Sequence, residues 1–511
     1  MKISGKSLAR VDRSSALYAR LRDAHQRIAK KDSTIWGSKA QAEAAIRLNW
    51  VDLPESSMDL LPILKKLSEN FAHATDIVLC GMGGSSLAPE VIAKTYKKEL
   101  FVLDSTDPEY VDHALNRDLS KTVVIVSSKS GSTIETSSQR ALFEARFTEA
   151  GLKPTSHIIF VTDPGSPLDI EVRAEGFTVV NADPNVGGRF SALTAFGLVP
   201  TALMGIDGAQ LLIDASAIKS SFLDKDEEIL DIAYLFSEVA GQYIAFTDAG
   251  SAVPGLSDWI EQLIAESTGK DQTGRLPIAT ETLDDAKVGG AFTVAFAGIG
   301  ADLNVEARLG EHFIFWEWVT ALLGAALKID PFNQPNVTEA KEQTLALLEE
   351  WGGVQPVLTP TCTDGNVGIF GDGQSLHDAL ATFIEGVEDG GYIAIMAYLD
   401  RRDDAKVAEL RSILAKKSNK PTSFGWGPRF LHSTGQFHKG GQRNGSFLQI
   451  TGETSLDIEI PGRTFGFKTL VAAQGLGDGL ALAKRKYPLL RLHLQNRGAG
   501  IDEILAAARK L

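Results

Sequence analysis

Short β-rich runs alternate with helix-length segments over the middle of the chain. The five runs are residues 76–80, 100–104, 122–127, 157–162 and 177–181, and they are rich in Val, Ile and Phe. A helix-length segment separates each run from the next, which is typical of a parallel sheet with helices on both faces. Before about residue 60, apolar and charged residues recur at helical spacing instead, at 16–31 and 39–49.

The rest of the chain repeats this pattern after one long predicted helix. Residues 227–246 are expected to form that helix, and strand-like runs follow at 292–297 and 392–399. We therefore predict an α/β protein with two doubly wound parallel-sheet domains. The expected division is an N-terminal helical segment at 1–55, a first domain at 56–215, a linking helix at 216–250 and a second domain with C-terminal helices at 251–511.

The composition narrows the class of protein. The 511 residues include 44% hydrophobic and 23% charged residues, which is the balance of a globular protein. A net charge of −14 argues against nucleic-acid and anionic-membrane partners. The longest apolar stretch, 313–327, contains Glu317 and is too short to span a bilayer. The N-terminus lacks the apolar core of a signal peptide, so we expect a cytoplasmic location.

Cysteine and histidine give no sign of a disulfide framework or a metal centre. Cys80 and Cys362 are isolated, and Cys80 ends an apolar run that is expected to be buried. The histidines and cysteines also lack the spacing of metal ligands. We therefore expect no metal and no other cofactor.

Two loops rich in glycine and hydroxyl side chains follow predicted strands. Residues 81–90, GMGGSSLAPE, come after the first strand, and residues 127–136, SSKSGSTIET, come after the third. Ligands of an open parallel sheet bind at the carboxyl ends of its strands. Bare glycine backbone, hydroxyl donors and the free N–H groups of a following helix suit a phosphate group. The two loops together, with Lys129 in the second, favour a phosphate site over simple Ser/Gly turns.

A dinucleotide site is the alternative interpretation of the first loop. Gly81 and Gly83 follow a strand, and Asp104 ends the next one, which is the order of a dinucleotide-binding fingerprint. However, Ser86 stands where that fingerprint has glycine or alanine, and the fingerprint does not account for the second loop. We therefore expect no dinucleotide.

A glycine-glycine-arginine turn leads into an apolar helix at residues 186–197, VGGRFSALTAFG. Gly187 and Gly188 let the backbone approach a ligand closely. Arg189 places a planar cation with five donors at the same turn. For these three residues alone, a simple turn before a helix is the alternative.

The string VGGRFSALTAFG resembles the first signature of the phosphoglucose isomerase family, and further segments resemble the same family. Residues 331–341, PFNQPNVTEAK, resemble a diverged second signature, and residues 259–271, WIEQLIAESTGKD, resemble the segment with the catalytic glutamate. The two hydroxyl loops are similar to those of the sugar isomerase fold. Residues 431–441, LHSTGQFHKGG, and the segment up to Leu482 are most similar to the isomerase half of fused transaldolase–phosphoglucose isomerases.

This resemblance implies two sugar-isomerase-type domains and a homodimer with shared sites. It also implies reversible conversion of glucose 6-phosphate into fructose 6-phosphate through an enediolate. The expected catalytic residues are Glu266 as the base, Arg189 beside the developing charge, Lys341 and His438. The expected substrate-binding residues are Gly84, Ser85, Ser128, Lys129, Ser130, Thr133 and Gln334.

The ring-opening histidine is the point where the sequence departs from the family pattern. In the family it ends an Asn-Gly-Gln-His segment that precedes the second signature. Here the nearest match, Thr-Gly-Gln-Phe-His at 434–438, follows that signature and places its histidine one residue later. The match favours His438, with His432 second, whereas His312 lies in an apolar helix and is expected to be packed. An isomerase that also uses mannose 6-phosphate and a non-catalytic sugar-phosphate sensor stay open as alternatives.

Overall fold

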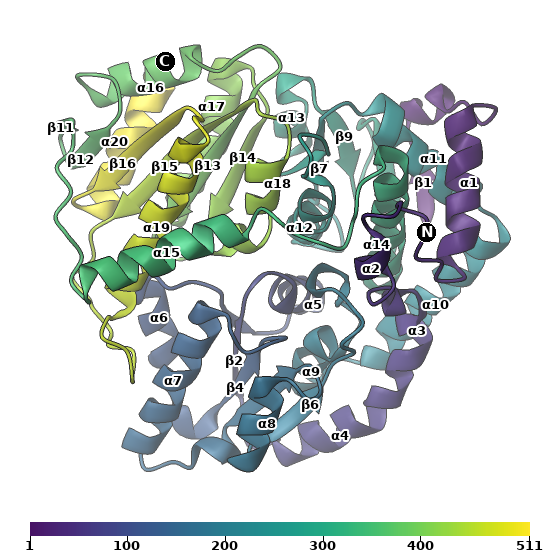
Figure 1. Ribbon diagram of the computed structural model, residues 1–511, viewed down its shortest axis with the longest axis horizontal. Coiled ribbons are helices and arrows are strands. Elements are labelled where there is room, and N and C mark those ends of the chain that lie inside the picture. Colours follow the sequence, from purple (N-terminus) through teal and green to yellow (C-terminus); the bar gives the residue numbers. More distant parts are fainter.

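Three β-sheets form the centre of the protein, one in each of its three lobes. The structure is a computed structural model that describes residues 1–511. Figure 1 shows the first sheet in the lower lobe, the second at the upper right and the third at the upper left. The predicted α/β class with parallel sheets is confirmed.

The first sheet has five parallel strands in the order β3-β2-β4-β5-β6. All five coincide with runs that the sequence predicts: β2 (Asp76–Gly81), β3 (Phe101–Leu103), β4 (Thr122–Ser127), β5 (Ile158–Thr162) and β6 (Thr178–Asn181). The helices of this lobe are α5 (Leu87–Thr95), α6 (Pro108–Leu115), α7 (Ile134–Glu149), α8 (Pro167–Ala174) and α9 (Ala195–Leu203).

Both faces of the first sheet are buried, because successive side chains of a strand point to opposite faces. Ile77 and Leu79 of β2 belong to a core that includes α5, α9 and the second sheet. Val78 and Cys80 belong to a separate core with α7, α15 (Thr338–Trp351) and α19 (Phe467–Lys484). Cys80 is a buried free thiol, as predicted.

The second sheet combines an N-terminal strand with four parallel strands in the order β1-β10-β9-β7-β8. Its strands are β1 (Lys2–Ser4), which is antiparallel to its neighbour, β7 (Tyr243–Thr247), β8 (Leu276–Thr280), β9 (Phe292–Ala295) and β10 (Leu303–Glu306). Its lobe contains α1 (Ala16–Ile28), α10 (Gly208–Asp224), α11 (Glu227–Tyr234), α12 (Leu256–Thr268) and α14 (Leu309–Leu327).

The long helix predicted at 227–246 is wrong in its second half. α11 continues only through a π-helical turn, Leu235–Val239, and Gly241 then adopts a positive φ of 67°. The next residues form β7, which pairs with β8 and β9. A short apolar run fits both a helix and a buried strand, so its partners in the sheet decide its conformation.

The third sheet has six strands in the order β11-β12-β16-β15-β13-β14. They are β11 (Cys362–Asp364), β12 (Val367–Phe370), β13 (Tyr392–Tyr398), β14 (Thr422–Trp426), β15 (Gly445–Gly452) and β16 (Leu489–Leu494). β13, β14, β15 and β16 are mutually parallel. β12 is antiparallel to β16, and β11 is antiparallel to β12. Besides α19, the lobe contains α16 (Leu376–Glu385), α17 (Glu409–Ser418), α18 (Gly435–Gly440) and α20 (Arg497–Lys510).

The third sheet changes the predicted number of sheets from two to three. The runs predicted at 292–297 and 392–399 both form strands, β9 and β13, but these strands lie in different sheets. The segment that resembles the second signature, 331–341, follows α14 of the second lobe and runs into the first turn of α15. The strands of the third lobe therefore follow this signature in the chain.

Four largely buried charges, with side chains 1–15% exposed, join the first lobe to the third. Glu90 on α5 and Asp104 after β3 face Arg401, which follows β13, and Arg429 in the 3₁₀ turn η11 (Arg429–His432). Arg401 lies 3.0 Å from Glu90 and 3.4 Å from Asp104, and Arg429 lies 2.8 and 3.2 Å from the same carboxylates. Burial alone would raise the pKa of Glu90, but the two guanidinium groups hold it well below its ordinary value.

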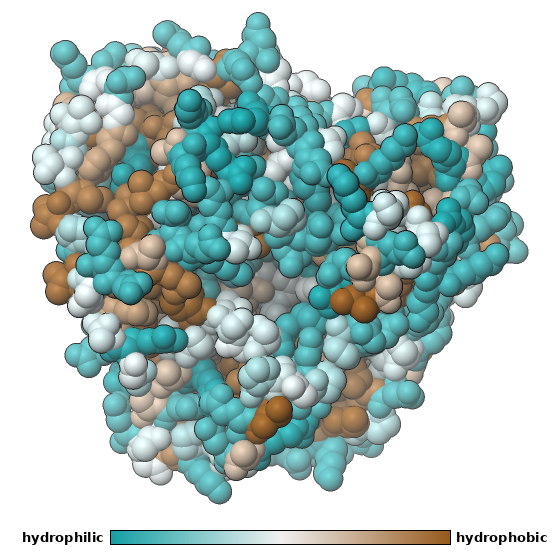
Figure 2. Space-filling model, viewed as in Figure 1, coloured by the Kyte–Doolittle hydropathy of each residue, from teal (hydrophilic) through white to brown (hydrophobic).

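Figure 2 shows a mostly hydrophilic face, with apolar side chains gathered at its left edge. In Figure 1 this edge holds the connection from α15 to β11. The connection contains Val354 and Val357, which are 76% and 96% exposed. None of the helices is both long enough and apolar enough to cross a membrane.

Replacing Arg401 tests whether the buried ion pairs contribute more to the free energy of unfolding than an exposed ion pair does. We expect Arg401→Met to lower the free energy of unfolding by about 3–5 kcal/mol, because Glu90 and Asp104 keep only one buried cation. Lys406→Ala is the control, since its ion pair with Asp502 in the same lobe is exposed, and we expect a loss of about 1 kcal/mol or less. Chemical denaturation measures both. Equal losses would contradict a special role for the buried cluster.

Candidate active site

A polar cavity of about 230 Å³ is lined by elements of all three lobes. Its walls come from the loops after β2 and β4, the Gly187–Gly188–Arg189 turn, α12, the segment before α15, and η11. Most residues singled out by the sequence line this cavity: Gly84, Ser85, Ser128, Lys129, Thr133, Arg189, Glu266, Gln334 and Lys341. Ser130 and His438 do not line it, whereas His432 does.

The hydroxyl-rich side of the cavity is suited to an anion. β2 and β4 are paired, so the loops at their carboxyl ends lie side by side. Thr133 precedes α7 without capping it through its side chain, so the first N–H groups of α7 are not bonded by that hydroxyl. The hydroxyl oxygens of Ser127 and Thr136 are buried on the cavity wall without a hydrogen-bond partner. Leaving buried hydroxyls unpaired is costly, so a ligand that bonds them would be stabilised.

The other polar residues of the second loop contribute differently. Ser128 Oγ accepts a backbone N–H of its own loop at 3.1 Å. Ser130 is exposed, and its Oγ lies 2.7 Å from another serine hydroxyl of the loop. Lys129 Nζ lies 2.7 Å from an Asp163 carboxylate oxygen and donates to the Val186 carbonyl at 3.0 Å. Lys129 thus fastens this loop to the turn that carries Arg189, while Ser130 faces solvent.

Close backbone contacts join the loop after β2 to the arginine turn and to η11. A Cβ on Gly84 would lie 2.1 Å from the carbonyl oxygen of Gly188. A Cβ on Gly83, whose φ is +56°, would lie 2.8 Å from both Gln262 Nε2 and the His432 carbonyl oxygen. Glycine at these two positions is therefore required for the first loop to meet the arginine turn and η11.

Arg189 is the buried cation of the cavity. Its side chain is 3% exposed, and burial lowers its pKa from the ordinary value. Nη1 lies 3.2 Å from Glu266 Oε1 and donates to Gln334 Oε1 at 3.1 Å. Nε donates to Ser267 Oγ at 2.8 Å, and Nη2 donates to two backbone carbonyls of the 331–333 segment at 2.6 and 3.1 Å. These bonds fix the plane of the guanidinium beside the carboxylate.

Glu266 lies near the end of α12, with its side chain 12% exposed at the cavity. Gln262 stands one turn earlier on the same helix face, and its Nε2 donates to Glu266 Oε2 at 3.2 Å. The same Nε2 lies 2.9 Å from the His432 carbonyl oxygen, to which it also donates. Gln262 therefore holds the carboxylate and the histidine-bearing turn in one place.

His432 ends η11 and enters the cavity from the third lobe. Its Nε2 lies 3.0 Å from Glu135 Oε1, and this buried carboxylate also accepts from Gln474 Nε2 at 2.8 Å. Burial alone would raise the pKa of Glu135, but the interaction with His432 lowers it. The carboxylate thus orients the imidazole through one nitrogen and leaves the other free for a proton transfer.

His438, the histidine favoured by the sequence, lies in an apolar core instead. Its side chain is buried in α18, with ring centroids 6.1 Å from Tyr392, 6.1 Å from Phe430 and 5.4 Å from Phe447. Neither ring nitrogen has a partner, and burial lowers the pKa of His438 to about 3. We therefore correct the choice of histidine: the structure brings His432, not His438, to the cavity.

Gln334 comes from the connection between α14 and α15, and Lys341 from the first turn of α15. Both are exposed, and both line the cavity. Gln334 is bonded to Arg189, whereas Lys341 makes no ion pair within the protein. His312, which was expected to be packed, is fully buried in α14, where its Nδ1 accepts from Trp316 Nε1 at 3.2 Å.

Contributors to the site that the sequence did not single out include Glu135, Gln262 and Gln474, and also the hydroxyls of Ser127 and Thr136. Glu135 lies within the second hydroxyl loop motif, and Gln262 precedes Glu266 by four residues, a spacing that predicts a shared helix face. Gln474 has no comparable signal, because α19 reaches Glu135 only through tertiary packing.

The acidic residue that a dinucleotide would need and the ligands that a metal ion would need lie outside this cavity. Asp104, the acid of the dinucleotide interpretation, is 1% exposed and bound to Arg401 and Arg429, so it is not accessible to a ribose. A metal ion would find its ligands outside the cavity, where His113 Nε2 lies 3.1 Å from Asp400 and 3.0 Å from Asp403.

Comparison with known proteins yields a family match for part of the chain. Residues 66–273 match the family model described as phosphoglucose isomerase. The glucose-6-phosphate isomerase of Campylobacter jejuni is 32% identical over 249 residues, which is 45% of this chain and 60% of that protein. That of Thermus thermophilus is 32% identical over 246 residues, 46% of this chain and 59% of that protein. The chain thus spans about three fifths of the length of these relatives.

A solved structure is similar in fold to a larger part of this chain than the family model covers. The structure of a glucose-6-phosphate isomerase from Chlamydia trachomatis superposes on 68% of this chain and 88% of that chain, with a TM-score of 0.54 and 20% identity. The family match covers the two hydroxyl-rich loops after β2 and β4, together with Arg189 and Glu266. Gln334, Lys341 and His432 lie beyond the matched residues. Residues 66–273 are thus similar in sequence to the phosphoglucose isomerase family, and the fold of the chain is similar to that of a solved glucose-6-phosphate isomerase.

Proposed function

We propose that the protein interconverts glucose 6-phosphate and fructose 6-phosphate. The observation that carries this proposal is the Glu266–Arg189 pair, set between hydroxyl-rich anion loops and the His432–Glu135 pair in one cavity. The reaction needs a base for a carbon-bound proton, a cation for an oxyanion and a group that opens the sugar ring. The names of the relatives support the same substrate.

The phosphate group would bind at the hydroxyl-rich wall, at the N-terminus of α7. Hydroxyl donors are present at Ser85, Ser127, Thr133 and Thr136, and Thr133 and Thr136 place the start of α7 at the cavity wall. The phosphate does not react, so its role is to hold carbons 1 and 2 of the open-chain sugar at Glu266.

Glu266 would move the proton between the two carbons. It takes the proton from C2 of the aldose, the C–H electron pair forms the C1–C2 double bond, and the aldehyde oxygen becomes the enediolate oxygen. The protonated carboxyl then returns the proton to C1, while the C2 hydroxyl gives up its proton to become the ketone and that proton passes to the C1 oxygen, which becomes a hydroxyl. Arg189 Nη1, 3.2 Å from Glu266, would stabilise the negative oxygen. One such donor typically lowers the barrier by about 3–4 kcal/mol.

His432 would open the sugar ring. Its free nitrogen takes the proton of the anomeric hydroxyl and delivers it to the ring oxygen as the bond between that oxygen and the anomeric carbon breaks, which is C1–O5 in glucose 6-phosphate and C2–O5 in fructose 6-phosphate. Glu135 keeps the imidazole oriented and stabilises its charged form during the transfer. Lys341, which has no carboxylate partner, would place a cation near the ring oxygen from the rim of the cavity.

Every group in this proposal comes from a single chain. The family resemblance implied a homodimer with shared sites, whereas His432 here reaches the cavity from the third lobe of the same chain. We therefore propose a site that is complete in one molecule, whatever the number of chains in the assembly.

Glu266→Gln tests the proposed base. We expect turnover to fall at least about a hundredfold, because the amide keeps the shape of the side chain but cannot accept the proton. Glu261→Gln is the matched control on the same helix, since burial raises the pKa of Glu261 to about 8 and this residue lies outside the cavity. A coupled assay with fructose 6-phosphate measures both variants. Nearly full activity of Glu266→Gln would mean that another residue is the base.

Thr133→Ala tests the phosphate position. Loss of one charge-assisted hydrogen bond should weaken binding by about 1.5–3 kcal/mol, so KM should rise roughly 10- to 100-fold with little change in kcat. Ser130→Ala is the matched control, because that hydroxyl is exposed and bonded to its own loop. Steady-state kinetics decides between them. An unchanged KM in Thr133→Ala would place the phosphate elsewhere.

The two histidine variants distinguish ring opening from packing. His432→Ala should slow the exchange between the anomers of bound fructose 6-phosphate at least about a hundredfold, because the proton carrier is lost. His438→Ala should leave this exchange nearly unchanged and should lower the thermal stability, since it opens a hole in an aromatic core. NMR exchange spectroscopy and thermal denaturation measure the two effects. The opposite pattern would restore the role to His438.

A further inference from the structure

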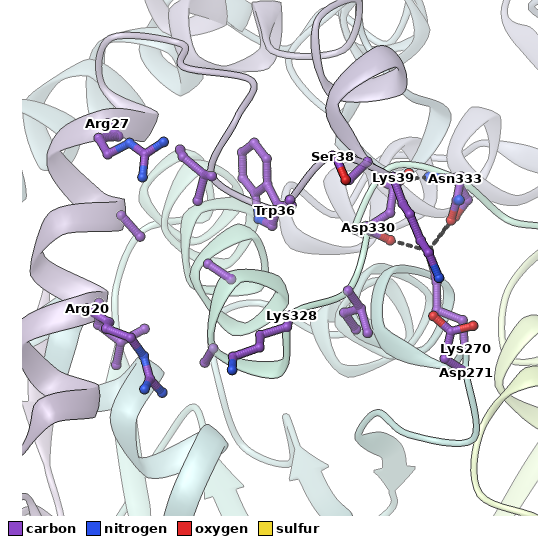
Figure 3. Close-up of a pocket in the computed structure, with 18 of the residues that line it drawn as sticks. Arg20, Arg27, Trp36, Ser38, Lys39, Lys270, Asp271, Lys328, Asp330 and Asn333 are labelled. Atoms are coloured by element: carbon purple, nitrogen blue, oxygen red, sulfur yellow. Dashed lines mark hydrogen bonds between the residues drawn. The ribbon is translucent and has the colours of Figure 1, made fainter.

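A second, larger cavity of about 770 Å³ lies on the other side of the segment 330–335. Asp330, Asn333 and Pro335 of this segment line it, whereas Gln334 lines the active site. Figure 3 shows its walls, which come from α1, the loop 35–40, the end of α14 and the residues just after α12. The two cavities have no lining residue in common.

Basic side chains outnumber acidic ones on the walls of this second cavity. Its cations are Arg20, Arg27, Lys39, Lys270 and Lys328, and its acids are Asp23, Asp271 and Asp330. The whole chain has the opposite balance, with 51 Lys and Arg against 65 Asp and Glu. The local charge of the second cavity therefore favours anions, although the net charge of the chain is negative.

Three of these cations have neither an ion-pair nor a hydrogen-bond partner within the protein. Arg27 is engaged by Asp32 and Asp23 at 2.8 and 3.3 Å. In contrast, the side chains of Arg20, Lys39 and Lys328 form neither ion pairs nor hydrogen bonds. Arg20 on α1 and Lys328 at the end of α14 point toward one another across the open side of the cavity (Figure 3). Two converging, unpaired cations are suited to a phosphate.

The inner wall between these cations is apolar and rigid. It consists of Leu17, Leu21, Ala24, Ile35, Trp36, Ala40, Ala325, Ala326 and Ile329. The Trp36 indole is fixed by donating its Nε1–H to the Ala321 carbonyl at 2.9 Å and by packing edge-on against Phe332 at 4.9 Å. A cavity of this size that combines an apolar wall with charged side chains can hold an organic ligand that has both an apolar and an anionic part.

Lys270 fixes the floor of the cavity. Its Nζ donates to the carbonyl oxygens of Asp330 and Asn333 at 2.6 and 2.5 Å, and to Asn333 Oδ1 at 2.9 Å. Arg189 donates to the same Asn333 carbonyl from the other side. Because the segment between the two cavities is held from both sides, the shape of the second cavity is preformed.

We propose that this second cavity is a ligand site for a phosphate ester that carries an aromatic or other apolar ring. The phosphate lies between Arg20 and Lys328, and the ring lies against the wall that contains Trp36. Inorganic phosphate would leave the apolar wall unused, and a neutral ring compound would leave both cations unused. Affinity therefore requires both parts in one molecule.

The probe for this site is 1-naphthyl phosphate, titrated by fluorescence against the full chain with and without fructose 6-phosphate. We expect one molecule bound per chain in both conditions, with inorganic phosphate and 1-naphthol binding at least tenfold more weakly. Arg20→Ala and Lys328→Ala should each weaken binding at least fivefold. Lys97→Ala is the matched control, because Lys97 is exposed and has a positive φ of 54°, close to the 59° of Lys328.

A variant that fills the cavity gives a test independent of charge. Ala326→Phe should remove the binding of 1-naphthyl phosphate while the activity with fructose 6-phosphate is kept. Three results would overturn the proposal: no binding by the unmodified chain, displacement by fructose 6-phosphate, or binding unaffected by Arg20→Ala. Equal affinity for inorganic phosphate would also overturn it. The fluorescence titration does not use catalysis, so failure of the proposed isomerase activity would leave its result intact.

Discussion

The buried cluster of Glu90, Asp104, Arg401 and Arg429 is the interaction on which the active site depends. Removing four charges from water is costly, and the cost is offset only when the two carboxylates meet both guanidinium groups. Few relative positions of the first and third lobes satisfy that condition. Arg429 begins the same 3₁₀ turn that His432 ends, so the cluster positions the histidine within a single turn of chain.

The remaining parts of the site are joined to this turn by short contacts. Gln262 bonds both Glu266 and the backbone of His432, and Gly83 lets the first loop approach the same carbonyl. Arg189 is in turn held by Ser267 one residue beyond Glu266. The base, the cation and the histidine therefore form one connected unit, although they come from three lobes.

The sequence predicted those parts of the structure that local chemistry determines. The five strands of the first sheet follow from their apolar runs, and the anion loops follow from glycine and hydroxyl residues at the carboxyl ends of strands. Glu266 and Arg189 were found through family resemblance, and the structure brings them within 3.2 Å of each other. In each case the signal lies within a dozen consecutive residues.

The features that the sequence missed depend on contacts between distant segments. Residues 243–247 became a strand because β8 and β9 flank them, and the third sheet could not be separated from the second by pattern alone. His438 matches the family motif more closely than His432, yet the surrounding aromatic side chains bury it. Spacing along the chain does not reveal which of two histidines six residues apart faces a cavity.

The connection between α14 and α15 is itself part of the active-site wall, since Gln334 lies in it and Lys341 lies in the first turn of α15 that follows it. This connection therefore cannot be lengthened or rearranged without moving groups that face the substrate. The exposed link from α15 to β11 carries no such group, and Val357 within it is 96% exposed. A break in that link would therefore divide the catalytic residues between two fragments. The first would contain Glu266 and Arg189, and the second would contain His432. Reassociation of two such fragments would be the event that creates the complete catalytic set.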